Sequence, residues 1–185
     1  LDVYANYSTG FRAPTVTQLY AGSTSAWGST ANNPDLDPEK SYNYEIGVRA
    51  KAKGITYEAA IFQIDRKDFI MKTSGNYGDT DTTDMWDNVG GARHRGLELS
   101  AIGNVVKELS FNLAYTYLDA YYTKYDTFGI DLDGNPRTSV VTFFDATDNK
   151  IPRTSKHQLN LILDYVPMKE LRLTSEVNAK SNYYA

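Results

Sequence analysis

The sequence of 185 residues contains no cysteine and only two histidines, His94 and His157. The absence of thiols excludes a disulfide framework, a thiol nucleophile and a thiolate metal site. A zinc site without cysteine would need both histidines and a carboxylate, and the two histidines lie in separate segments without ligand spacing. We therefore read them as surface or rim residues, and we expect no metal site and no bound cofactor.

Long hydrophobic runs are also missing. No stretch approaches the roughly 18 apolar residues that suggest a spanning helix, and the mean hydropathy is −0.49, so a helical membrane protein is excluded. The formal net charge is −4 and the basic residues do not cluster, which argues against nucleic acid as a partner. The chain begins at Leu1, inside an alternating segment and without a signal peptide, so we expect a fragment of a longer exported protein.

No motif for catalysis is present. The nucleophile-elbow string Gly-x-Ser-x-Gly does not occur, and the pair Ser155 and His157 shares a strand face by ordinary i, i+2 spacing. The segment from Asp131 to Asn135 resembles the start of a calcium loop, but Pro136 and Thr142 stand where an EF-hand needs Gly and Glu. We expect a turn at Asp131–Asn135 and no enzyme; looser calcium binding in the acidic loops stays open.

What the sequence does contain is strict alternation. In residues 41–50, 109–117 and 159–165, every second side chain is aromatic or aliphatic and those between are mainly polar. The apolar positions are Tyr42, Tyr44, Ile46 and Val48; Leu109, Phe111, Leu113, Tyr115 and Tyr117; and Leu159, Leu161, Leu163 and Tyr165. Successive side chains of a strand point to opposite faces. An apolar face opposite a polar face, repeated from strand to strand, is typical of a wall between lipid and water, as in a transmembrane β-barrel.

The pattern predicts seven principal strands in an all-β, antiparallel transmembrane barrel segment. The expected ranges are about 1–8, 41–51, 54–71, 85–102, 108–124, 156–166 and 170–182. Several reach the roughly 9–11 residues that cross a bilayer at a tilt. Short connectors at 52–54, 103–107 and 166–169 alternate with long polar ones at 72–84 and 125–155, while residues 9–40 form another irregular stretch. Short turns on one side and long loops on the other are typical of an outer-membrane barrel.

Tyrosine is the abundant aromatic residue, with 15 tyrosines against 7 phenylalanines and 2 tryptophans. Tyrosine suits a membrane interface because its ring is apolar and its hydroxyl polar. It also suits a soluble antiparallel β-sandwich that binds saccharide, so this alternative stays open, with an outer-membrane enzyme as a third hypothesis. A sandwich would have to bury its alternating apolar faces against each other.

An ordered set of local strings runs through nearly the whole chain. The strings are Gly10–Thr15 with Gln18–Tyr20, Asn33–Ser41 leading to Tyr44–Gly47, Asn88–Gly90 leading to Ala92–Glu98, Ala114–Ala120, and Ile151–Arg153 with His157. In order and spacing they resemble the barrel of TonB-dependent outer-membrane receptors, siderophore-receptor type. Any one string is weakly specific, whereas the ordered set is strongly specific.

The resemblance implies part of an active transporter in the bacterial outer membrane, in contact with its lipid. Such a receptor binds and imports a scarce ligand, and a ferric siderophore is expected here, with haem or cobalamin as further possibilities. The resemblance also implies energy from an inner-membrane TonB complex, reached through an N-terminal segment missing from these residues. Because transporter barrels of this kind have 22 strands around a plugged lumen, residues 1–185 are expected to be a slice of the C-terminal half, without the plug domain and the final strands.

In the family, extracellular loops and the upper lumen help to capture the ligand, which here implicates residues 72–84 and 125–155. Aromatic rings there could stack on a siderophore, and arginines could pair with an anionic one. The candidates are Tyr121, Tyr122, Tyr125, Phe128, Phe143, Phe144, Arg137 and Arg153. A tyrosine near a strand end is also a typical membrane-interface anchor, and both interpretations stay open.

Alternation also places two glycines, Gly47 and Gly96, on the polar face of the predicted wall. The charged residues Glu45, Arg49, Glu58 and Glu98 fall on the same face. A glycine there permits close approach of another backbone, such as a plug. It equally fits the shaping of the barrel wall, with inner-wall ion pairs beside it and no part in ligand contact.

Overall fold

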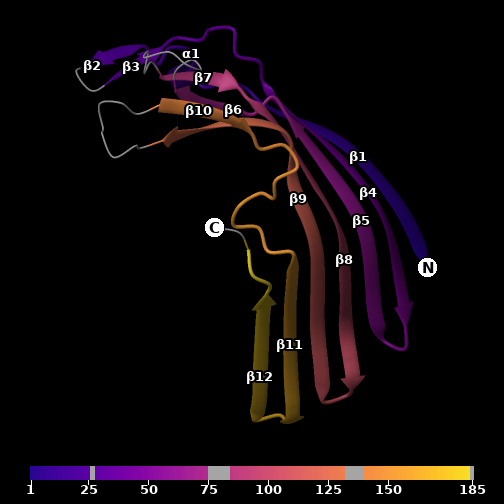
Figure 1. The fold of residues 1–185 in the computed structure, drawn as a ribbon. Helices are drawn as coiled ribbons and strands as arrows, with labels where there is room; N and C mark the ends of the chain where they lie inside the picture. The colour runs from indigo at the N-terminus through magenta and orange to yellow at the C-terminus, as the bar shows by residue number, and fades with distance from the viewer. Residues whose placement is uncertain (26–27, 75–83, 132–139, 184–185) are drawn as a thin grey trace.

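The computed structural model describes residues 1–25, 28–74, 84–131 and 140–183, which form one long curved sheet and a smaller sheet at one end (Figure 1). The order in the large sheet is β1-β4-β5-β8-β9-β11-β12, and every neighbouring pair is antiparallel. These wall strands are β1 (Asp2–Arg12), β4 (Glu39–Ala52), β5 (Ile55–Lys67), β8 (Gly90–Val106), β9 (Leu109–Asp131), β11 (His157–Met168) and β12 (Leu171–Lys180). The sequence-based prediction of seven antiparallel wall strands is confirmed.

The smaller elements lie at one end of the wall. The short helix α1 (Val16–Leu19) precedes β2 (Ser23–Ser25) and β3 (Gly28–Ala31), which join β7 (Asp84–Asn88) and β6 (Ile70–Ser74) in a four-stranded sheet. The strand β10 (Val140–Asp145) pairs with the far part of β9. Among the described residues, no helix has the length and hydrophobicity to cross a membrane.

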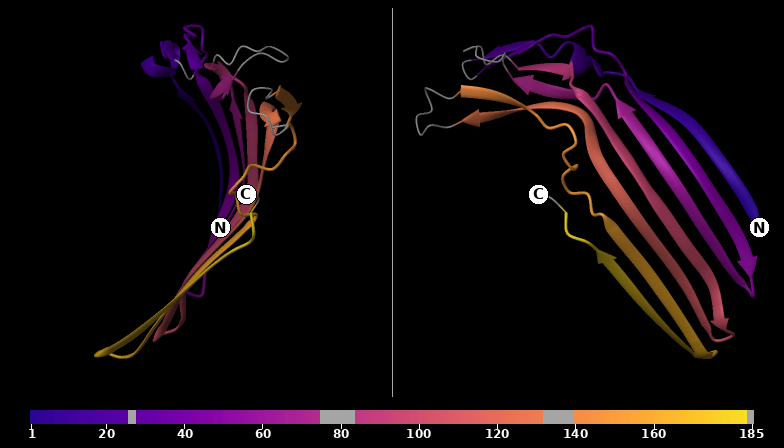
Figure 2. Two further views of the ribbon diagram at one scale, coloured as in Figure 1. Left: turned by 60° about the vertical axis from the view of Figure 1, so that its left-hand side comes forward. Right: turned by 45° about the vertical axis from the view of Figure 1, so that its right-hand side comes forward.

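Three short turns lie together at the opposite end, which we call the turn end (Figures 1 and 2). They join β4 to β5, β8 to β9 and β11 to β12. In the first, Lys53 and Gly54 have positive φ angles of 50° and 80°, the backbone that a two-residue hairpin turn requires. The other end carries the four-stranded sheet and the β9–β10 hairpin, and we call it the loop end.

The structure corrects several predicted boundaries at the loop end. The expected strand 54–71 is two strands, because Asp68, with a φ angle of 59°, bends the chain between β5 and β6. The expected strand 85–102 is likewise interrupted at Val89, between β7 and β8. The expected loops are shorter, since β1 runs on to Arg12 and β9 runs on to Asp131.

Each wall strand has one apolar and one polar face, and the register aligns these faces across the sheet. Ile46, Ile61, Leu97 and Tyr117 are successive partners in one row of the apolar face. The next row, on the polar face, contains Gly47, Ala60, Glu98 and Thr116. A one-residue slip would exchange the two faces, so the hydrophobic pattern specifies this register.

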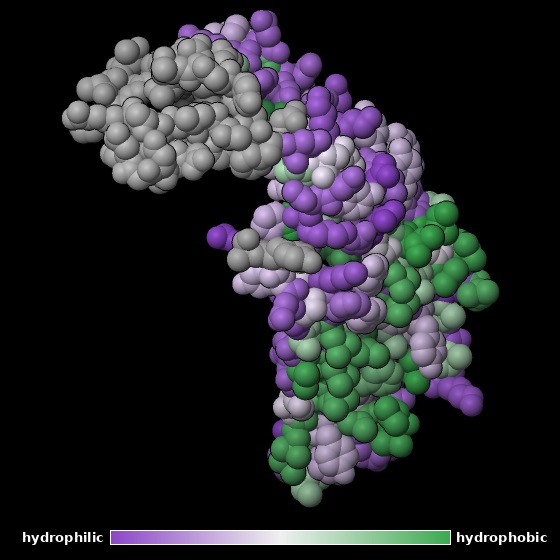
Figure 3. Space-filling view, in the orientation of Figure 1, coloured by the Kyte–Doolittle hydropathy of each residue, from purple (hydrophilic) through white to green (hydrophobic). Residues whose placement is uncertain are grey.

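The residues that the structure describes leave the apolar face uncovered. Ile46 is 54% exposed, Ile61 58% and Val177 48%, whereas the buried apolar residues in the described part of the chain are mostly small. They are Leu36, Ala60, Ile70, Ala92, Ala120 and Ala146. Figure 3 shows the apolar side chains gathered over the turn-end part of the wall. A soluble sandwich would bury these rows, so this arrangement contradicts that hypothesis and fits a wall facing lipid.

Candidate functional site

The polar face carries a compact group around Tyr4, Gly47 and Glu58. The Tyr4 hydroxyl donates to Glu58 Oε1 at 3.2 Å, and the Arg49 guanidinium donates to the same oxygen at 2.9 Å. A Cβ atom placed on Gly47 would lie 2.3 Å from Cζ of Tyr4. The missing side chain at Gly47 therefore makes room for the Tyr4 ring to lie flat across the neighbouring strand.

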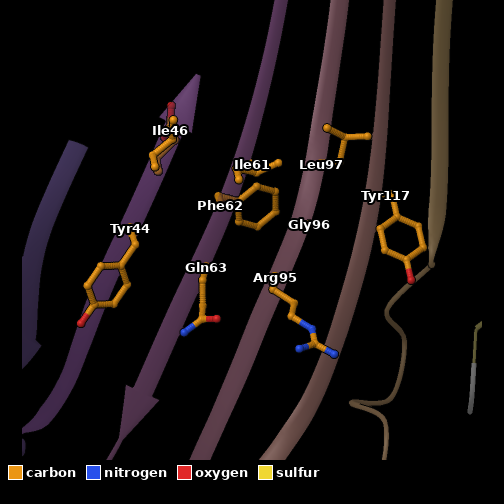
Figure 4. A pocket seen from close by; sticks show the side chains of 10 residues that line it. Tyr44, Ile46, Ile61, Phe62, Gln63, Arg95, Gly96, Leu97 and Tyr117 are labelled. Carbon is orange, nitrogen blue, oxygen red and sulfur yellow. The ribbon is translucent and has the colours of Figure 1, made fainter. Parts of the chain in front are cut away.

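Gly96 has a related role on β8. A Cβ atom there would lie 2.1 Å from the Tyr117 carbonyl oxygen and 2.9 Å from the Phe62 ring, and Figure 4 shows Phe62 beside Gly96. Both glycines thus lie beneath aromatic rings of the same wall. This explains them without a plug, and it supports the interpretation that they shape the barrel wall.

Glu39 ties β1, β4, β5 and β6 together where the wall meets the loop end. The side chain is 9% exposed and accepts hydrogen bonds from Arg12, one of them 2.9 Å long from Nε, and from the backbone N–H of Ile70 at 3.0 Å. Arg66 lies 3.6 Å away. A buried carboxylate with two arginines and a backbone donor is well satisfied. Glu39, at the end of the irregular segment, is thereby fixed to Arg12 at its start.

Asn88 clamps that irregular segment against the β6–β7 hairpin. The side-chain oxygen accepts from the Asp37 N–H at 2.8 Å, and the side-chain nitrogen donates to the carbonyls of Asp37 at 3.0 Å and Asp68 at 2.8 Å. A second amide, that of Asn33, donates to the Trp86 carbonyl at 2.9 Å. These bonds satisfy backbone groups that strand pairing leaves open. The short elements α1, β2, β3, β6 and β7, which we call the loop-end lobe, therefore have a fixed connection to the wall.

A stacked tyrosine pair lies farther along β9. Gly91 and Ala92 of β8 pair with Lys124 and Tyr122, which makes the intervening Thr123 an extra residue in β9. Such a bulge shifts the alternation of side chains, and the rings of Tyr122 and Tyr125 stack with centroids 4.4 Å apart. The register of Tyr122 with Ala92 assigns the pair to the polar face.

The chain that follows β10 returns along β9 and holds this pair in place. The Asp148 N–H donates to the Tyr122 carbonyl at 2.8 Å, and the Ala146 N–H donates to the Tyr125 carbonyl at 2.7 Å. At the start of this return, the hydroxyl and backbone N–H of Thr147 donate to Asp145 and hold the pKa of that carboxyl below its ordinary value. The tyrosine pair is therefore supported by regular backbone hydrogen bonds.

The structure separates one of the other predicted contact residues, Tyr121, from this pair. Tyr121 points to the apolar face, where the cationic groups of Arg95 and Lys150 lie over its ring at 5.4 and 5.3 Å. Arg153 is exposed, with a φ angle of 58°. Phe143 pairs with Phe128 in the β10–β9 register and Phe144 follows on β10; Arg137 lies outside the described residues.

The two histidines lie on opposite faces of the wall. His94 pairs in register with Ile64 and Ala120 on the polar face. His157 lies on the apolar face, where its Nδ1 is 2.9 Å from the Tyr115 hydroxyl oxygen. Side chains on opposite faces of one sheet cannot share a ligand. Within the described ranges, no group of three His, Asp or Glu side chains is placed to hold a metal ion.

Sequence reasoning did not find the roles of Glu39 and Asn88. Both stand in local strings quoted above, but their partners lie 27 and 51 residues away in the chain. The available signal was weak, since it consisted of a polar residue at each border between a loop and a strand. The bulge at Thr123 gave no signal, because alternation alone places Tyr121 and Tyr125 on one face and Tyr122 on the other.

A family model described as TonB-dependent receptor-like, β-barrel, matches residues 1–185. The vitamin B12 transporter BtuB of Photobacterium profundum is 32% identical over 120 residues, 65% of this chain and 18% of that protein. A protein of Haemophilus ducreyi named as binding hemoglobin and hemoglobin-haptoglobin is 34% identical over 129 residues, 62% of this chain and 13% of that protein.

A solved structure shows the same fold. The siderophore receptor PirA from Pseudomonas aeruginosa superposes with a TM-score of 0.61 at 20% identity, covering 96% of this chain and 30% of that one. The chain thus spans less than a fifth of the two curated relatives and less than a third of this structural neighbour.

Proposed function

The chain belongs to the TonB-dependent receptor-like β-barrel family of the outer membrane, and on this premise we propose that it forms part of the wall and mouth of an importer for a scarce metal chelate. A ferric siderophore is the first candidate ligand. The remaining wall, the plug domain and the segment that contacts TonB would belong to a longer protein. Members of the family are receptors and transporters, so we propose no enzymatic role.

The observation that carries this proposal is the continuous two-faced wall. Seven strands keep one apolar and one polar face in register, and the apolar rows are exposed. In the described residues, β1 and β12 pair on one side only. Unpaired strand edges favour pairing with further strands, which supports a place inside a larger barrel.

We assign ligand contact to the polar face at the loop end. Short turns face the periplasm and longer loops face outward in such barrels, so the loop end would meet an external ligand first. Tyr122 and Tyr125 present stacked rings there, and Arg153 is an exposed cation on the return segment. Planar catecholates or a porphyrin can stack on such rings, while a guanidinium can pair with an anionic chelate.

An uptake experiment tests the proposed import. The complete receptor would be expressed in a Gram-negative strain lacking its own receptors for siderophores, haem and cobalamin. We expect growth on ferric siderophores, and we expect that growth to disappear when TonB is deleted. Growth on haem or cobalamin alone would replace the siderophore assignment but keep the importer. Growth on none of the three, or growth independent of TonB, would refute the proposed function.

A binding experiment tests whether the polar face at the loop end contacts the ligand. Replacing Tyr122 and Tyr125 by Ala should weaken binding of the imported ligand by about tenfold, since ring stacking contributes roughly 0.5–1.5 kcal/mol per pair. Tyr121→Ala is the matched control, because it removes an adjacent ring that lies on the other face. Equal losses in both variants, measured by fluorescence quenching on the purified receptor, would contradict this assignment.

A further inference from the structure

We propose that the loop-end border of the apolar face binds the phosphate groups of outer-leaflet glycolipid. The inference rests on the placement of the wall in the outer membrane and is independent of the imported ligand. The surface is a belt of cations that begins where the apolar rows end. We call it the cationic belt; it contains Lys40, Lys67, Arg93, Arg95, Lys150 and Lys156, with Asp65, Asp68 and Asp119 between them.

The register shows that the belt continues the lipid-facing side. The row after Ile61 and Leu97 on this face contains Gln63, Arg95 and Asp119. Figure 3 shows the same change, from apolar side chains near the turn end to polar ones toward the loop end. The belt therefore lies at the height of lipid headgroups when the apolar rows lie in the hydrocarbon.

The belt presents positive charge outward. It has six cations against three carboxylates, whereas the whole chain has a net charge of −4. Two of the carboxylates are recessed, with side chains 19% exposed at Asp65 and 14% at Asp119. The side chains of their partners are more exposed, with 35% at Arg93, 55% at Arg95 and 45% at Lys150. The carboxylates thus hold the cations in position from beneath, and the outer surface is cationic.

Two lysines of the belt lie over tyrosine rings. Lys67 Nζ lies 5.5 Å from the centre of the Tyr42 ring, and Lys156 Nζ lies 5.6 Å from that of Tyr117. Neither lysine has an ion-pair partner in the part of the chain that the structure describes. A tyrosine at the membrane interface positions the ammonium group above it without neutralising the charge.

A groove on the apolar face leads up to the belt. It has a volume of about 490 Å³, and its sides include Tyr44, Ile46, Ile61, Leu97 and Tyr117 (Figure 4). Gln63 and Arg95 line its loop-end part. An acyl chain fits the apolar part, and the guanidinium of Arg95 suits a phosphate oxygen at the top. A lipid with an anionic phosphate headgroup matches both parts of this surface, and the loop end faces the outer leaflet.

The test measures lipid binding to the complete receptor in detergent by native mass spectrometry. The probes are bisphosphorylated lipid A and the same lipid with both phosphates removed. Lys67→Gln with Lys156→Gln removes two belt charges, and Lys107→Gln with Lys169→Gln removes two charges from exposed residues in the turns at the other end. A cation near an anionic surface contributes about fivefold in affinity, so the belt variant should bind lipid A at least tenfold more weakly.

The turn-end variant should bind lipid A like the unmodified receptor, and dephosphorylated lipid should bind weakly to all variants. Lys67→Arg with Lys156→Arg, which keeps the charge, should retain binding and shows that a loss is not a folding defect. Unchanged binding in the belt variant, equal loss in the turn-end variant, or equal binding of dephosphorylated lipid would overturn the proposal.

Discussion

Replacement of Leu99 by arginine tests whether the apolar face contacts hydrocarbon. Leu99 pairs with Ala59 and Tyr115 in the middle of the apolar rows, and 40% of its surface is exposed. The next residue, Ser100, pairs with Glu58 and lies on the polar face. Leu99→Arg and Ser100→Arg therefore introduce the same charge one residue apart, on opposite sides of the wall.

The expected free-energy costs differ clearly. An arginine on the lipid face of a barrel costs about 2–4 kcal/mol at the bilayer midplane, while lumen positions tolerate charge. If the apolar face met water, a substitution at a partly exposed position would change stability by about 0.5 kcal/mol. We expect Leu99→Arg to lower the free energy of unfolding by about 2–4 kcal/mol. Ser100→Arg should stay within about 1 kcal/mol, because Ser100 lies on the polar face beside the carboxylate of Glu58.

The assay is urea titration of the complete receptor in phosphatidylcholine bilayers, with the folded fraction read from heat-dependent gel mobility. The difference between the two variants carries the result, because both have the same added charge. A difference below about 1 kcal/mol, or a larger loss for Ser100→Arg, would refute the assignment of the apolar face to lipid.

Four further predictions concern individual contacts. Gly47→Ala should lower the free energy of unfolding by less than about 1 kcal/mol, and Tyr4→Ala in the same chain should remove that cost, because only the movable tip of the Tyr4 ring meets the new Cβ. Gly96→Ala should cost about 1–3 kcal/mol in the same titration, because its Cβ meets a backbone carbonyl oxygen; a smaller loss than for Gly47→Ala would contradict this reasoning. Asn88→Ala should speed amide hydrogen exchange in the loop-end lobe while the wall strands keep their protection, since it removes three clamping hydrogen bonds. The lowered pKa of Asp145 means that its contribution to the turn is present at neutral pH and lost as pH falls through that pKa. Exchange at this turn, corrected for intrinsic rates, should therefore rise in acid and not in mild base.

The wall strands could be predicted from the sequence because their signal is local. Alternation at residues 41–50 and 109–117 already assigned each side chain to a face, and the structure keeps these assignments. The short turns were predictable for the same reason, since Lys53-Gly54 has turn chemistry of its own. Contact with lipid requires apolar side chains along the whole of a strand. The alternation is therefore repeated many times, and single exceptions do not hide it.

The loop end was predicted less well because its order depends on distant partners. The four-stranded sheet joins β3 to β7 in parallel, more than 50 residues apart in the chain, and no periodicity in residues 9–40 indicates it. The separation of Tyr121 from Tyr122 and Tyr125 depends on one extra residue in β9. A bulge is defined by pairing with β8, so β9 alone does not reveal it.

The amino-acid sequence by itself determined that this chain is a wall with a polar and an apolar face, since alternation with period two is a property of each strand alone. The tertiary structure decided which side chains meet. It brought Glu39 to Arg12, stacked Tyr122 on Tyr125 and set the cations of the belt above recessed carboxylates. These meetings arise from register, bulges and strand order, which are fixed only when separate strands pair.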